Sequence, residues 1–94
     1  MKYSELRELA LTNSLANYIC NLDELQDEGK TADEILEMVE QGDSEVVIWE
    51  PFEDWEPSSI ESEVINLQLS NIREYESLLK SVMGDDMFNA WKEA

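Results

Sequence analysis

Apolar residues recur along much of this chain at intervals of three and four, the spacing of one face of a helix. In the first part of the chain this spacing predicts a helix from about Ser4 to Asp27, with Ser4 as its N-cap. The polar run at residues 12–14 is the point where this helix would bend or break. Gly29 suits the end of the helix. The predicted core stripe consists of Leu11, Leu15, Tyr18, Leu22 and Leu25.

A second, shorter helix is predicted from Thr31 to Gly42. Thr31 and Glu34 have the spacing of a capping box, in which each side chain bonds the backbone amide of the other residue. Acids on the outer side lie about 5–6 Å apart on neighbouring turns, where like charges destabilise an isolated helix. The row is therefore not explained by helix stability. Its members are Asp33, Glu37 and Glu40.

The rest of the chain predicts one extended segment and two further helices. Residues 46–49 are β-branched or aromatic and indicate a short extended segment, which needs a partner in the helices, in another short strand or in another chain. A long helix is predicted from about Ser58 to Gly84, with Ser58 and Glu61 at capping-box spacing. Asp85 would cap a short last helix.

These elements predict one mainly α domain over residues 1–94. The expected architecture is a small helical bundle of two long and two short helices, with one short extended segment near residues 45–50. A chain of 94 residues with 43% apolar residues has the size of one domain and can bury a modest core.

Charge sets this chain apart from an ordinary bundle. It has 23 acids against six bases, a net charge of −17. Residues 21–64 hold sixteen acids against Lys30 alone, a net charge of −15, whereas residues 1–20 are neutral and residues 65–94 carry −2. The sequence therefore predicts one strongly negative surface, which repels nucleic acid and anionic membranes and attracts basic surfaces.

Aromatic residues and acids alternate within this section, in the stretch VVIWEPFEDWEP at residues 46–57. Pro51 and Pro57 favour an extended backbone at Glu50 and Glu56. The aromatics either attach this stretch to the bundle or act as interface anchors, since Trp is enriched at binding hot spots. The predicted partner-binding residues are Asp33, Glu37, Glu40, Asp43, Glu45, Glu50, Glu53, Asp54, Glu56, Trp49, Phe52 and Trp55.

Residue types that most enzymatic and metal sites require are missing from the sequence. There is no histidine and one cysteine, which excludes Cys/His zinc sites and histidine-based catalytic triads. Placing Gly29 at position six of an EF-hand loop puts Ile35 where a bidentate Glu is required. Six unclustered bases offer no nucleic-acid groove. We expect no catalytic residues, no metal, no cofactor and no direct binding of nucleic acid.

The charge distribution predicts a non-catalytic acidic inhibitor that mimics nucleic acid. It would occupy the basic DNA- or RNA-binding surface of a host-defence or nucleic-acid-processing protein. In size and acidity the chain resembles the small DNA-mimic proteins that phages and mobile elements use against host defence. The alternative is a small helical adaptor or regulatory subunit that binds a protein partner through residues 49–55, with the charge serving solubility.

Two further expectations concern assembly and location. The neutral N-terminal helix is where two copies of such an acidic chain could meet as a homodimer without mutual repulsion. The sequence shows no signal-peptide pattern and no apolar run of about 18 residues. We therefore expect no membrane association and a cytoplasmic protein, in the host cytoplasm if a phage encodes it.

Overall fold

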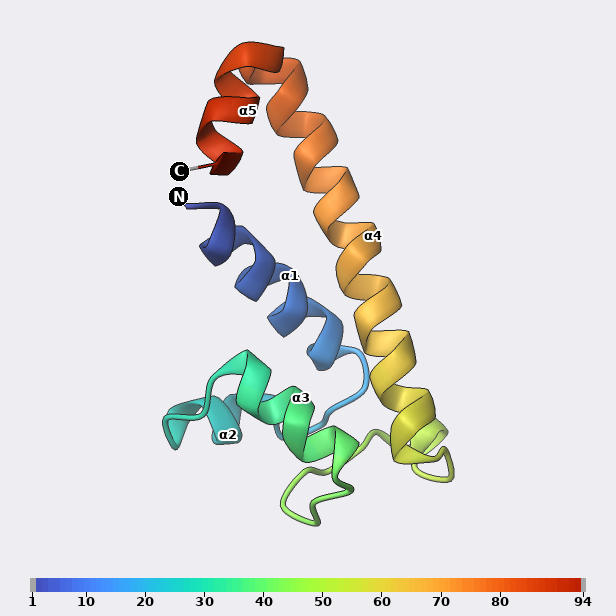
Figure 1. Ribbon diagram of the computed structural model, residues 1–94. Helices are drawn as coiled ribbons and strands as arrows, with labels where there is room; N and C mark the ends of the chain where they lie inside the picture. Colours follow the sequence, from blue (N-terminus) through green and yellow to red (C-terminus); the bar gives the residue numbers. More distant parts are fainter. Residues whose placement is uncertain (1, 94) are drawn as a thin grey trace.

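The computed structural model describes residues 2–93, and within them it shows a mainly α architecture (Figure 1). Five α-helices and no β-strand occur in this range, together with a short 3-10 turn at Glu50–Phe52. This confirms the predicted small helical bundle, although its helices number five and not four. The helices are α1 (Tyr3–Ala16), α2 (Leu22–Asp27), α3 (Ala32–Glu40), α4 (Pro57–Met83) and α5 (Asp85–Glu93).

The molecule is elongated, with extents of 45 × 25 × 17 Å, and α4 runs along most of its length (Figure 1). Helix α1 runs antiparallel to α4; the two lie close at the end of α1 and diverge towards its start. Helices α2 and α3 pack at the end where α1 and α4 meet. Helix α5 folds back from the end of α4 towards the start of α1, so the first turn of α1 and the last turn of α5 lie near each other.

The main buried cluster lies where α1, α2, α3 and the start of α4 meet. It includes most of the predicted stripe, while Tyr18 is half-buried against it. Burial of these side chains is the main force that holds the short helices α2 and α3 in place, because isolated helices of this length are unstable in water. The cluster consists of Leu11, Leu15, Ile19, Leu22, Leu25, Ala32, Ile35, Val39, Ile60 and Val64.

The predicted continuous helix from Ser4 to Asp27 is wrong. Helix α1 begins at Tyr3, with Lys2 at the N-cap position, and ends at Ala16; the chain then turns before α2 begins at Leu22. The polar run at 12–14 does not break the helix, and the buried Ser14 hydroxyl is satisfied by donating a hydrogen bond of 2.8 Å to the Ala10 carbonyl one turn earlier.

The break falls at residues 17–21 because the backbone there pairs with the segment 46–49. The amide of Cys20 donates to the Val47 carbonyl at 2.7 Å, and the amide of Trp49 donates to the Tyr18 carbonyl at 3.0 Å. These bonds form an isolated antiparallel bridge between Ile19 and Ile48. The expected extended segment therefore exists, and its partner is a short stretch of the same chain.

The other helix boundaries agree with the sequence at most points. The capping box of α3 is confirmed: the Glu34 amide donates to the Thr31 hydroxyl at 3.2 Å, and the Thr31 amide donates to the Glu34 carboxylate at 3.5 Å. Gly84 ends α4 with a φ of 83°, a backbone conformation that disfavours any residue with a Cβ.

Two further predicted caps fail in addition to Ser4, which lies inside α1. Helix α4 begins at Pro57 with Glu56 as its N-cap, so Ser58 lies inside the helix and makes no capping box with Glu61. Proline favours this first helical position because its φ is already helical and its missing amide hydrogen is not needed there. Asp85 is the first residue of α5 and not its cap; the first helical bond runs from the Phe88 amide to the Gly84 carbonyl.

Candidate functional site

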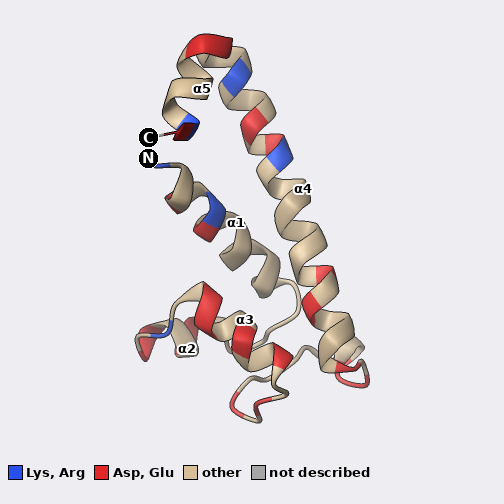
Figure 2. Ribbon diagram, viewed as in Figure 1, with Lys and Arg blue, Asp and Glu red and all other residues tan. Residues whose placement is uncertain are grey.

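The acids of residues 21–64 gather at one end of the molecule, which we call the acidic end (Figure 2). It comprises α2, α3, the segment 41–56 and the first turns of α4. Every predicted acid lies on this end, and all are exposed except Asp43, which is half-buried. The acids of α2 and of its C-cap residue, which were not among the predicted site residues, add to the same end. They are Asp23, Glu24, Asp27 and Glu28.

The carboxylates of the acidic end have no ion-pair partner among residues 2–93. The ion pairs in this range join Lys80 to Asp85 at 3.8 Å and Lys92 to Glu76 at 3.2 Å, and both lie outside the acidic end. The net charge of −15, which already counts Lys30, is therefore directed into solvent.

A hollow of about 420 Å³ opens between the end of α3 and the segment that follows it. Its charged lining is Glu34, Glu37, Asp43 and Glu45, with Lys30 at the same site. A concave site with four carboxylates and one ammonium suits the side chain of an arginine or lysine from another protein.

Asn21 holds the segment that carries these loop acids. Its side-chain amide donates to the Glu45 carbonyl at 2.8 Å, and its side-chain oxygen accepts from the Val47 amide at 2.9 Å. This two-point contact fixes Glu45 beside the hollow. The residue was missed by the sequence analysis, since a single asparagine carries no pattern.

The aromatic residues of the segment pack on the end of α1. The Trp49 indole donates a hydrogen bond to the Ala16 carbonyl at 3.2 Å. The centroid of the Phe52 ring lies 4.8 Å from that of the Tyr18 ring and 5.0 Å from that of the Trp55 ring. They therefore attach the segment to the bundle. Trp49 and Trp55 still remain 44% and 42% exposed, so both present surface to solvent.

The expected extended backbone at Glu50 is wrong, whereas Glu56 is extended with φ −67° and ψ 147°. Glu50 begins the 3-10 turn, with hydrogen bonds from the Phe52 amide to the Trp49 carbonyl and from the Glu53 amide to the Glu50 carbonyl. The turn lets the rings of Phe52 and Trp55 pack against each other and against Tyr18. These contacts outweigh the preference that a following proline imposes.

At the opposite end, a small polar cluster joins α1, α4 and α5. The Tyr3 hydroxyl donates to the Glu76 carboxylate at 2.8 Å, and Lys92 reaches the same oxygen at 3.2 Å. The hydrogen bond from Tyr3, followed by Lys92, lowers the pKa of Glu76. Burial, followed by the neighbouring Glu76, raises the pKa of Tyr3.

Two classes of site are not found in the described part of the chain. Within residues 2–93, no three His, Cys, Asp or Glu side chains are grouped so that they could hold a metal ion. No helix in that range has both the length and the apolar character needed to cross a membrane. No protein-family model, no curated protein and no solved structure matches this chain.

Proposed function

We propose that the acidic end binds the basic, nucleic-acid-binding surface of another protein and so blocks that surface. The protein is then a non-catalytic inhibitor that mimics nucleic acid. The observation that carries this proposal is the gathering of sixteen acids, with Lys30 as the one base, at a single end of the molecule. A target that processes nucleic acid or defends a host against foreign DNA presents a basic surface of the required kind.

The charge spacing of α3 supports the proposal. At a rise of about 1.5 Å per residue, the nine residues of α3 span about 13.5 Å and carry four acids, or one charge per about 3.4 Å. A single strand of B-DNA carries one phosphate charge per about 3.4 Å of helix axis. The acids at residues 43–56 supply further charges on the same end.

Solubility alone would be served by acids spread over the whole surface. In this chain the stretches 11–20 and 65–71 contain no charged residue, and five of the six bases lie beyond them, away from the acidic end. Concentrated like charge also destabilises the fold by self-repulsion, which argues that the distribution serves binding.

The second candidate is an adaptor that binds through Trp49 and Trp55. The observation in its favour is the half-exposed state of both indoles on the segment they attach. The two functions differ in the force that holds the partner. Electrostatic binding weakens steeply with salt, whereas contact with apolar rings does not.

A charge-reversal experiment separates the two. The chain is immobilised, and proteins from a bacterial lysate are captured at low salt and challenged with high salt or duplex DNA. The test variant combines Glu37→Lys, Glu40→Lys, Glu53→Lys and Asp54→Lys. Its matched control combines Glu8→Lys, Glu74→Lys, Asp86→Lys and Glu93→Lys, and both variants reduce the net charge from −17 to −9.

For a nucleic-acid mimic, the captured protein is a nucleic-acid-binding protein that duplex DNA displaces. Raising the salt from about 50 to about 200 mM lowers its affinity by about 1,000-fold or more. The test variant loses the partner and the control retains it. A partner that resists salt and DNA, and is lost on Trp49→Ala with Trp55→Ala, would establish the adaptor and reject mimicry.

A further inference from the structure

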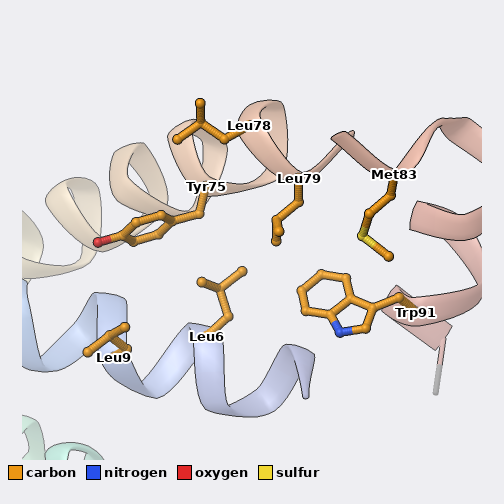
Figure 3. Close-up of a pocket in the computed structure, with 7 residues that line it drawn as sticks. All are labelled: Leu6, Leu9, Tyr75, Leu78, Leu79, Met83 and Trp91. Atoms are coloured by element: carbon orange, nitrogen blue, oxygen red, sulfur yellow. The ribbon is translucent and has the colours of Figure 1, made fainter. Parts of the chain in front are cut away.

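An apolar groove of about 330 Å³ lies at the end of the molecule opposite the acidic end (Figure 3). Leu6 and Leu9 of α1 face Tyr75 and Leu79 of α4 across it, and Trp91 of α5 closes one side. We call residues 2–10 and 72–93, which form this part of the molecule, the near-neutral end. The groove is open to solvent, and Leu9 is 41% exposed.

An apolar ridge stands beside the groove on α4. Leu78 and Val82, one turn apart, are 66% and 83% exposed. Leu78 also lines the edge of the groove, so ridge and groove form one continuous apolar surface. The same helix buries Ile72 and turns Leu79 towards α1, so its second half is apolar on two sides. An exposed apolar surface of this size is typical of a site where another molecule binds.

We propose that the near-neutral end pairs with the same surface of a second copy of this chain. In a two-fold dimer the interface is self-complementary, so the ridge of each copy can enter the groove of the other. This chain supplies both halves of such a contact at adjacent positions. Ridge residues Leu78 and Val82 of one copy seat between α1 and α4 of its partner.

Charge selects a second copy as the occupant. The near-neutral end carries a net charge of −2 and holds five of the six bases, so two such ends meet with little repulsion. The bases and acids interleave along α4 and α5, which allows opposite charges to pair around a two-fold axis. A basic partner is drawn to the acidic end instead, and an acidic partner that lacks a near-neutral surface of its own is repelled.

The dimer does not depend on the proposed function. It leaves both acidic ends free, at the far ends of a molecule that is 45 Å long in each copy. Salt also acts in opposite directions on the two kinds of binding. Added salt screens the residual repulsion between two −17 chains and favours the dimer, whereas it weakens binding to a basic partner.

Sedimentation equilibrium of the full chain over a wide concentration range tests the proposal. We expect a species of twice the 10.9 kDa chain mass, which becomes more populated as salt rises. Val82→Lys, and separately Leu78→Lys, should raise the dissociation constant by about 100-fold or more, because each would place an unpaired ammonium in the interface. Val47→Lys is the matched control: it introduces the same charge at a 49% exposed position of the acidic end and should leave the dimer intact.

Cross-linking locates the interface directly. Val82→Cys in a Cys20→Ser background should give a dimer with a short bis-maleimide, while the exposed native Cys20 should not. Circular dichroism melts confirm that each variant folds.

A chain that stays monomeric at every concentration overturns the proposal, as does a dimer that survives both lysine variants. Native mass spectrometry that finds a monomer carrying a small apolar molecule assigns the groove to a ligand and rejects the second copy.

Discussion

The acidic end and the near-neutral end are built in opposite ways. The acidic end covers a closed apolar cluster with carboxylates that have no ion-pair partner among residues 2–93. The near-neutral end pairs acids with bases, as in Lys92 with Glu76, and leaves an apolar groove and ridge open to solvent. The chain has therefore placed most of its net charge at one end and its most exposed aliphatic side chains at the other.

This difference means that the two ends suit different kinds of contact. Carboxylates act on a partner over a distance, speed its approach and lose strength with salt. Apolar surface acts only on contact and needs shape complementarity. Stability should also differ between the ends, since only one has a closed core, and each of the following substitutions tests part of that comparison.

The largest effect is expected from Leu15→Ala, because Leu15 is fully buried in the cluster that joins α1, α3 and α4. Truncation of such a leucine lowers the free energy of unfolding by about 2–5 kcal/mol. The matched change is Leu79→Ala, at a half-buried position of the groove, and it should lower the free energy of unfolding by only about 1 kcal/mol. Urea denaturation at equal protein concentration measures both. Equal losses would show that the two ends are equally well packed, which would contradict the claim that only the acidic end has a closed core.

A smaller effect is expected from Asn21→Ala, which removes both hydrogen bonds that hold the segment at Glu45 and Val47. The loss should be about 1–3 kcal/mol, and it should be local. Hydrogen exchange of the Val47 and Cys20 amides should speed up, while that of α5 amides should not change. Asn17→Ala is the control, since the Asn17 side chain makes an exposed bond to the Asn13 carbonyl and does not reach the segment. If Asn17→Ala had the same effect on Val47, Asn21 would not be the residue that holds the segment.

The smallest effect is expected from Tyr3→Phe at the near-neutral end. Its hydrogen bond is the main reason that the pKa of Glu76 is lowered, so the variant should raise that pKa towards its ordinary value, as NMR titration can measure. The stabilisation linked to Glu76 is present above the ordinary carboxyl pKa and is lost as the pH falls through the lowered pKa.

The stability difference between wild type and Tyr3→Phe should therefore be about 0.5–1 kcal/mol near neutral pH and smaller in acid. At alkaline pH, the raised pKa of Tyr3 makes the free energy of unfolding fall as the pH rises. Its contribution is complete below the ordinary tyrosine pKa and is lost as the pH rises through the raised value. A Glu76 pKa that does not change on Tyr3→Phe would contradict the assigned contact.

The sequence predicted those parts of the fold that depend on local chemistry. The capping box of Thr31 and Glu34, the stop at Gly84 and the stripe from Leu11 to Leu25 all follow from side chains near one another in the chain. The break between α1 and α2 could not be predicted in this way. It depends on backbone hydrogen bonds to residues 46–49, which lie far along the chain and have no local signal.

The same distinction between local signals and distant contacts applies to the candidate site. Charge is additive along a sequence, so the acidic end was evident from composition alone. The groove was missed because it depends on how α1 and α4 diverge and on where α5 folds back. One signal was available: Tyr75, Leu78 and Val82 widen the apolar face of α4 beyond what a single packing partner would cover.

The length of α4 has a consequence for how the two ends affect each other. Its 27 residues span about 40 Å at a rise of about 1.5 Å per residue. The first turns of α4 belong to the acidic end, and from Glu63 there to Glu76 the helix rises about 20 Å. This distance is more than two Debye lengths, each about 8 Å at physiological ionic strength. Salt therefore screens the field of the acidic end before it reaches the groove. Neutralising the acids with a bound partner should leave the charge interactions around Tyr3 and Glu76 unchanged.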